Sequence, residues 1–122
     1  MLEKHYVDAV LHVGVCTNSY LYNELKLSLS TEDVLSNIRS RYAPAMVFNN
    51  IKHIFESTEY SFGFIGKPCD IAGMQNFLRL FPQWKDRVRY YISIFCAGMP
   101  SYNATIKTWK LSGHADHRKR GA

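Results

Sequence analysis

The stretch "GFIGKPCDIAGM", Gly63–Met74, joins a predicted strand to a predicted helix and decides how the rest of the chain is interpreted. Before it, "YSFGFI" (60–65) is a short apolar strand that ends at Gly66. After it, "DIAGMQNFLRLF" (70–81) places five apolar residues on one helical face, Ile71, Met74, Phe77, Leu78 and Phe81. The join itself holds a glycine, a lysine, a proline and Cys69, so a chemically capable residue lies where a strand meets a helix.

Strands and helices alternate along the rest of the sequence. Strands are expected over 6–15, which is apolar enough for a central position, over 20–30, which looks half exposed, and over 87–96. Helices are expected over 30–40 with Ser30 as cap, over 45–58, and over 102–112 with Ser101 as cap, while Pro44 predicts a loop over 40–43. This order predicts an α/β fold with a mostly parallel sheet of about four strands flanked by helices.

Length and composition limit the classes of protein to consider. The 122 residues, 47% of them hydrophobic, suit one domain, which we place at 1–112, with a polar basic tail over 113–122 that we expect to be disordered. The net charge of +5 is scattered and forms no nucleic-acid-binding motif, so no nucleic acid partner is expected. No apolar segment is long enough to cross a membrane and the N-terminus has no signal peptide pattern, which predicts a cytoplasmic protein without membrane insertion.

Three cysteines at irregular spacing do not form a secreted disulfide framework. Cys69 and Cys96 both follow predicted strands of a parallel sheet, where ligands collect, and they can therefore meet in space. Cys69 also lies beside a helix N-terminus and near Lys67, which favours a thiolate. The residues leave three roles open: a buried structural thiol, a metal or cluster ligand, or a nucleophile, for which no histidine is an obvious base. Cys16 is expected to be an unliganded thiol at a strand end.

The segment from Gly63 to Thr105 strongly resembles the beta-subunit family of coenzyme F420 hydrogenases and dehydrogenases. The resemblance is carried by two motifs in order, G-x-P-C-x-I-A-G at Gly66–Gly73 and F-C-x-G-x-P-S at Phe95–Ser101. The stretches "LEKHYVDAVL" and "SRYAP" also look like upstream segments of the family. The likeness therefore extends from about Leu2 to Leu111.

This resemblance implies an oxidoreductase with FAD and a four-iron four-sulfur cluster. Cys69 and Cys96 match two of the cluster ligands, and cysteine thiolates are the usual ligands of such clusters. Ser40, Arg41 and Tyr42, together with Gly66, Lys67 and Pro68, correspond to segments near the flavin. The implied electron carrier is coenzyme F420 or a ferredoxin-like donor, with a redox partner subunit.

The sequence departs from the family because it contains no C-x-x-C pair to complete the cluster. We therefore expect a truncated fragment that is inactive alone and tends to self-associate. An altered C-terminal reading frame would explain the early end. Two alternatives stay open: an α/β interaction module without cofactor, and a thiol redox protein that uses Cys69 and Cys96.

Overall fold

A computed structural model describes residues 1–39 and 43–113 and contains one five-stranded sheet. Its strands are β1 (Ala9–Cys16), β2 (Ser19–Ser28), β3 (Ala45–Met46), β4 (Phe62–Gly66) and β5 (Val88–Ser93). The spatial order is β3-β2-β1-β4-β5, so β1 is central, as its apolar sequence predicts. The pairs β1–β4, β2–β3 and β4–β5 are parallel, and the β1–β2 hairpin is antiparallel. The predicted α/β fold with a mostly parallel sheet is confirmed, with one strand more than expected.

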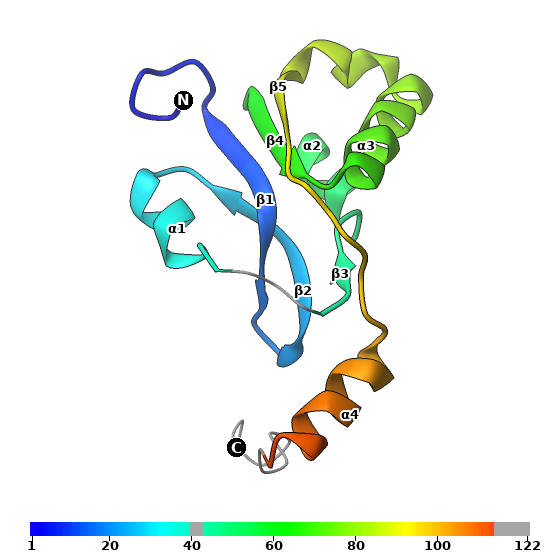
Figure 1. Cartoon of the computed structure of the whole chain (residues 1–122). Coiled ribbons are helices and arrows are strands. Elements are labelled where there is room, and N and C mark those ends of the chain that lie inside the picture. Colours follow the sequence, from blue (N-terminus) through cyan, green and yellow to red (C-terminus); the bar gives the residue numbers. More distant parts are fainter. Residues whose placement is uncertain (40–42, 114–122) are drawn as a thin grey trace.

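The helices lie on both sides of this sheet (Figure 1). They are α1 (Thr31–Ser36), α2 (Ile51–Ser57), α3 (Pro68–Leu80), the 3-10 helix η1 (Pro82–Arg87) and α4 (Tyr102–Leu111). A Cβ atom on Gly14 would meet Asn37, directly after α1, at 2.5 Å, so α1 covers the face of β1 that carries Gly14. Among the described residues, no helix has the length and apolar character needed to cross a membrane.

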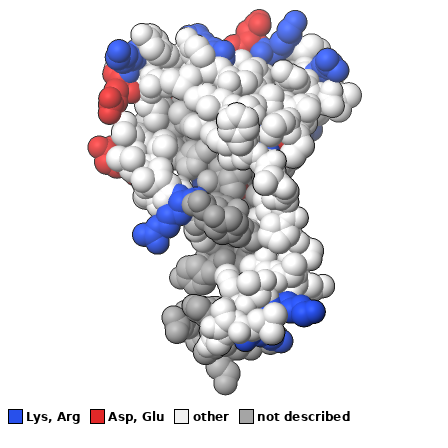
Figure 2. All heavy atoms as spheres, in the orientation of Figure 1, with Lys and Arg blue, Asp and Glu red and all other residues white. Residues whose placement is uncertain are grey.

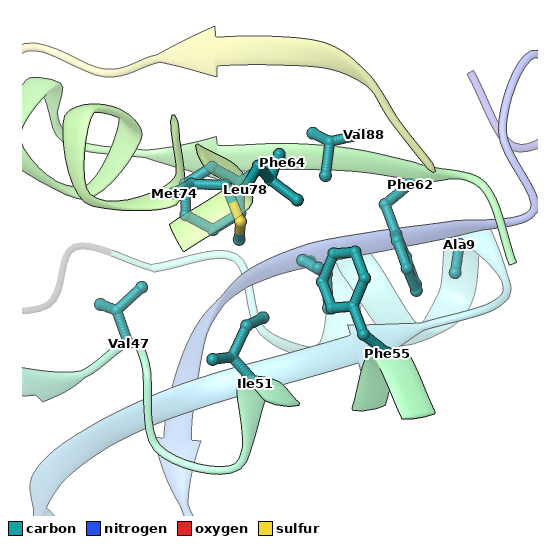
Figure 3. Packing of buried hydrophobic residues seen from close by; sticks show 10 residues of the cluster. Ala9, Val47, Ile51, Phe55, Phe62, Phe64, Met74, Leu78 and Val88 are labelled. Carbon is teal, nitrogen blue, oxygen red and sulfur yellow. The ribbon is translucent and has the colours of Figure 1, made fainter. Parts of the chain in front are cut away.

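The opposite face of the sheet carries the hydrophobic core, which α2 and α3 close (Figure 3). Its largest members, Phe55 of α2 and Phe62 and Phe64 of β4, are at most 1% exposed. The other members are smaller: Ala9, Leu11, Val47, Ile51, Met74, Leu78 and Val88. Because Phe62 and Phe64 alternate with Gly63 along β4, one face of this strand anchors the core.

The predicted helix caps are confirmed. The Ser30 hydroxyl accepts the Asp33 N–H at 3.1 Å, and the Asp33 carboxylate accepts the Ser30 N–H at 3.2 Å. In the same way the Ser101 hydroxyl accepts the Ala104 N–H at 3.2 Å at the start of α4. These local bonds satisfy donors that a helix start leaves free, which explains why they can be recognised in the sequence.

The helix expected over 45–58 is wrong in its first half. Ala45 and Met46 form β3, which pairs with Asn23 and Glu24 of β2, and the helix begins only at Ile51. The change follows from Pro44, whose carbonyl accepts the Asn23 N–H at 3.0 Å and so starts the pairing. An extended segment thereby replaces the first helical turns.

The strand expected over 87–96 is also shorter in the structure. β5 begins at Val88 and ends at Ser93, which pairs with Gly66, the last residue of β4. Beyond this point β4 offers no further partner, because the chain turns into α3. Cys96 therefore lies past the strand, in the segment that leads to α4.

Arg87, at the end of η1, ties α2 to the strands. Its guanidinium donates to the carbonyl oxygens of Phe55 at 2.7 Å and Tyr60 at 2.9 Å, and to the Thr58 hydroxyl at 3.1 Å. The same group lies over the rings of Phe55 and Phe62, at 5.0 and 5.1 Å from their centroids. Burial lowers the pKa of Arg87, although an arginine stays charged at neutral pH.

Candidate functional site

A cavity of about 360 Å³ lies where β1 and β4 separate. The two strands pair only as far as Leu11 and Phe64, after which β1 continues in its hairpin and β4 leads into α3. The next residues of each strand, His12 and Val13 on β1 and Ile65 and Gly66 on β4, line the cavity. This is the carboxyl end of two parallel strands whose connections diverge, the position at which α/β sheets bind ligands.

The remaining walls come from four parts of the chain. They comprise Val34, Asn37, Ile38 and Arg39 from α1 and the segment after it, Asn23, Ala43 and Ala45 from β2 and the β3 region, Lys67 and Asp70 from α3 and its cap, and Ile94 and Met99 from beyond β5. Most of these side chains are apolar. A mostly apolar cavity with a few polar groups is typical of sites for organic cofactors and substrates.

The most strongly bonded polar group in the cavity is the ion pair between Lys67 and Asp70. The Asp70 carboxylate accepts the Lys67 backbone N–H at 2.9 Å and the Lys67 ammonium at 2.7 Å, and the two side chains are only 10% and 16% exposed. Asp70 also favours the positive end of α3 by its charge. A Cβ atom on Gly66 would approach the Asp70 Cβ to 2.8 Å, so the glycine is needed for this contact.

Two buried polar residues of the hairpin fix the other wall. His12 is 7% exposed, with its Nε2 2.7 Å from the Ser28 hydroxyl and its Nδ1 3.2 Å from the Val13 carbonyl oxygen. A neutral ring protonated on Nδ1 satisfies both contacts. Asn23 is 4% exposed and donates from Nδ2 to the Ala43 carbonyl oxygen at 2.9 Å. His12 is thus a satisfied core histidine, as expected, and Asn23 holds the chain at Ala43 against the cavity.

The predicted flavin contacts divide into three groups. Gly66 and Lys67 line the cavity. Pro68 is the first residue of α3, just beside it. Ser40, Arg41 and Tyr42 lie outside the described residues, although their neighbours Arg39 and Ala43 both line the cavity.

Sequence reasoning missed Asn23 and Asp70 as members of this site. An asparagine within an apolar strand was a usable signal for Asn23, because a buried amide needs a specific partner. An aspartate two residues after a proline at a helix start was the signal for Asp70. The sequence also suggested that Lys67 acts on Cys69, whereas its ammonium is bound to Asp70.

Cys69 and Cys96 leave the sheet at the same end. Cys69 is the second residue of α3, and Cys96 lies three residues beyond β5, whose extension is held by the Ile94 N–H donating to the Gly66 carbonyl oxygen at 3.0 Å. Both cysteines are exposed, so the interpretation as buried structural thiols is wrong. The Cys69 Sγ lies 3.9 Å from the Asp70 Oδ1, a weak donor contact.

The described residues do not complete a cluster site. Within 1–39 and 43–113, no three or more His, Cys, Asp or Glu side chains come together to hold a metal ion. A four-iron cluster needs about four thiolates, and Cys69 and Cys96 supply two. Their assignment as cluster ligands stays a prediction.

Comparisons with known proteins agree with the resemblance. Residues 60–118 match the family model for the C terminus of the coenzyme F420 hydrogenase/dehydrogenase beta subunit, a range that spans β4, α3, β5 and α4. No curated protein matches the chain.

A solved structure of the F420-reducing NiFe hydrogenase complex from Methanosarcina barkeri, derivatised with xenon, contains a similar chain with a TM-score of 0.77. The similarity covers 89% of the present chain and 38% of the other, at 18% sequence identity, so the present chain spans well under half of that protein and shares its fold. The family match and the fold together support the coenzyme F420 hydrogenase/dehydrogenase beta-subunit family as the family of this chain.

Proposed function

We propose that this chain is the part of an oxidoreductase that holds the ring system of a flavin in the cavity between β1 and β4. The observation that carries the proposal is the position of the cavity at the fork of two parallel strands, with the Lys67–Asp70 pair at its edge. The flavin would be FAD, which the family resemblance implies. When bound, a flavin supplies electron transfer, and the protein binds and orients it.

The walls of the cavity fit such a group. Its volume of about 360 Å³ lies within the range of small-molecule sites, and its apolar side chains suit the faces of a planar ring. The charged residues in its lining are Arg39, Lys67 and Asp70, so the described lining carries one more positive than negative charge. This excess favours an anionic ligand such as a phosphate-bearing flavin.

The buried ion pair gives the polar edge of the cavity a fixed geometry. The Lys67 ammonium cannot move freely, because Asp70 binds it and also binds the backbone N–H of the same residue. A charge that is already in place needs no reorganisation when a ligand enters. We assign Lys67 and the backbone at Gly66 to binding and orientation.

Electrons would reach or leave the flavin through partners. The solved structure with the similar fold is a multi-subunit hydrogenase complex, which supports a partner subunit for this chain too. The carrier would be coenzyme F420 or a ferredoxin-like protein. Because two thiols do not complete a cluster, no electron-transfer step is assigned to Cys69 or Cys96.

Binding of flavins to the full 122-residue chain tests the proposal. FAD, FMN and riboflavin are titrated with purified protein while quenching of flavin fluorescence is measured. Ile65→Trp fills the cavity and Arg39→Gln removes a cation from its lining, whereas Leu80→Trp and Arg79→Gln make the same changes on the exposed side of α3.

We expect the cavity variants to bind FAD at least roughly tenfold more weakly, the equivalent of 1.4 kcal/mol, and the control variants to bind as the wild type does. Circular dichroism confirms that each variant is folded. A folded wild type that quenches no flavin, or equal binding by cavity and control variants, would overturn the proposal.

A second candidate function is thiol redox chemistry at Cys69 and Cys96. It is favoured by the exposure of both cysteines and by their position at the same end of two paired strands. Oxidation would remove two electrons and two protons from the thiols and form one disulfide, with a disulfide-containing partner as the oxidant. This function needs no metal.

A further inference from the structure

β5 forms one edge of the sheet and has β4 as its single neighbour in the part of the chain that the structure describes. Apart from Val88, all of its residues are exposed. Exposed apolar side chains continue beyond it: Tyr90 42%, Tyr91 36%, Ile92 40%, Ile94 50%, Phe95 108% and Met99 41%. A row of apolar residues this long on a free edge marks a surface that another chain covers.

The backbone of β5 is ready for a further strand. The Ile94 N–H points to β4, where it donates to the Gly66 carbonyl oxygen. Because the direction of the amide alternates along a strand, the N–H groups of Tyr91 and Ser93 point away from β4. The pairing with β4 is regular from Tyr90 to Ser93, so the free edge is straight over this length. None of these residues is a proline, which would block an added strand.

The charges around this edge are of one sign. The sequence from Val88 to Leu111 contains Arg89, Lys107 and Lys110 and no Asp or Glu. In Figure 2 the strip that leads from β5 down to α4 is largely white, and Lys and Arg atoms appear at its lower end. At the other end, Arg89 approaches Asp8, whose pKa is lowered first by hydrogen bonds from Ser61 and further by Arg89.

These charges distinguish between two occupants of the edge. A second copy of this chain would bring the cations of one edge close to those of the other, which disfavours the contact. A segment with carboxylates would instead pair with them. The amides and the apolar side chains require that this segment be extended and partly apolar.

We propose that the free edge of β5 binds an extended segment of another protein, in which apolar residues alternate with carboxylates, as an added sixth strand of the sheet. Main-chain hydrogen bonds to Tyr91 and Ser93 would provide affinity, and Arg89 would select for acidic segments. This inference does not depend on the flavin, because the edge and the cavity are tested by different ligands and different readouts.

Two short synthetic peptides serve as probes, with valine and isoleucine alternating with glutamate in one and with lysine in the other. Amide hydrogen exchange of the full chain is measured with each peptide, and affinities are measured by fluorescence anisotropy at low and high salt. We expect the acidic peptide to slow exchange at Tyr91 and Ser93 and to bind more weakly as salt rises. Arg89→Glu should reduce its affinity roughly fivefold and raise that of the basic peptide, whereas Arg79→Glu, on α3, should change neither.

Three results would overturn the inference. One is equal affinity for the acidic and basic peptides. Another is binding of the acidic peptide with unchanged exchange at Tyr91 and Ser93. The third is a dimer in sedimentation experiments that protects these two amides without any peptide, because a second copy would then be the occupant.

Discussion

Replacement of Asp70 by asparagine tests how the polar edge of the cavity is held. In the wild type this carboxylate binds both the backbone N–H and the ammonium of Lys67, with the two side chains nearly buried. An asparagine oxygen can still accept the N–H, but it carries no charge. The variant therefore isolates the ionic part of the interaction and leaves the Lys67 ammonium largely buried without its counterion.

The expected loss follows from these contacts. Removing one partner of a fully buried ion pair costs about 3–5 kcal/mol, and hydrogen bonds to a charged group contribute about 1.5–3 kcal/mol. Because Lys67 keeps 16% exposure and can partly reach water, we expect a loss near the lower values, about 2–3 kcal/mol. In urea unfolding this lowers the midpoint by roughly 1–2 M, for a slope of about 1–3 kcal/mol/M.

Asp33 provides a matched control, because it occupies the same position in α1 and accepts the Ser30 N–H at 3.2 Å, but it has no lysine partner. Asp33→Asn should therefore cost clearly less than Asp70→Asn. A second readout is the affinity for FAD, which should fall in Asp70→Asn and stay unchanged in Asp33→Asn. If both variants lost the same stability, the ion pair would contribute nothing beyond the helix cap, and the reasoning would be refuted.

Three further predictions address the rest of the chain. Arg87→Lys should lower the free energy of unfolding by about 2–4 kcal/mol, because one ammonium cannot replace three hydrogen bonds and the ring contacts, while Arg79→Lys on the surface should have little effect in the same urea experiment. The pKa of Asp8 is lowered in the folded state, so its stabilisation is present above the usual aspartate pKa and is lost as pH falls through the folded value; the difference in stability between wild type and Asp8→Asn should close over that acidic window, and a constant difference would contradict it. Mild oxidation of the full chain should give a disulfide between Cys69 and Cys96 by mass spectrometry, and independent alkylation of both thiols under all oxidising conditions would show that they do not meet.

The parts of the fold that the sequence predicts well are those fixed by neighbouring residues. The join at Gly66–Cys69 needs only an apolar strand, a glycine and a proline at a helix start, and the structure has β4, a close Gly66–Asp70 contact and α3 there. The caps at Ser30 and Ser101 are equally local. In each case the signal and the interaction lie within a few residues of one another.

The errors arise where a distant strand decides the outcome. Ala45 and Met46 form β3 because β2 lies beside them, although their own sequence continues a helical pattern. The alternation from Val88 continues through Cys96, but β5 stops at Ser93 because β4 has ended at Gly66. Strand pairing of this kind is set by tertiary contacts, which a local pattern does not contain.

The candidate site combines both kinds of information. The rule that parallel strands bind ligands at their carboxyl ends identifies the correct edge of the sheet from the sequence, and Gly66 and Lys67 do lie there. The cavity itself depends on the register of β1 and β4, which ends at Leu11 and Phe64. One more paired residue on each strand would close this fork around Ile65, so the length of the β1–β4 pairing, more than any single side chain, determines that this protein has room for a ligand.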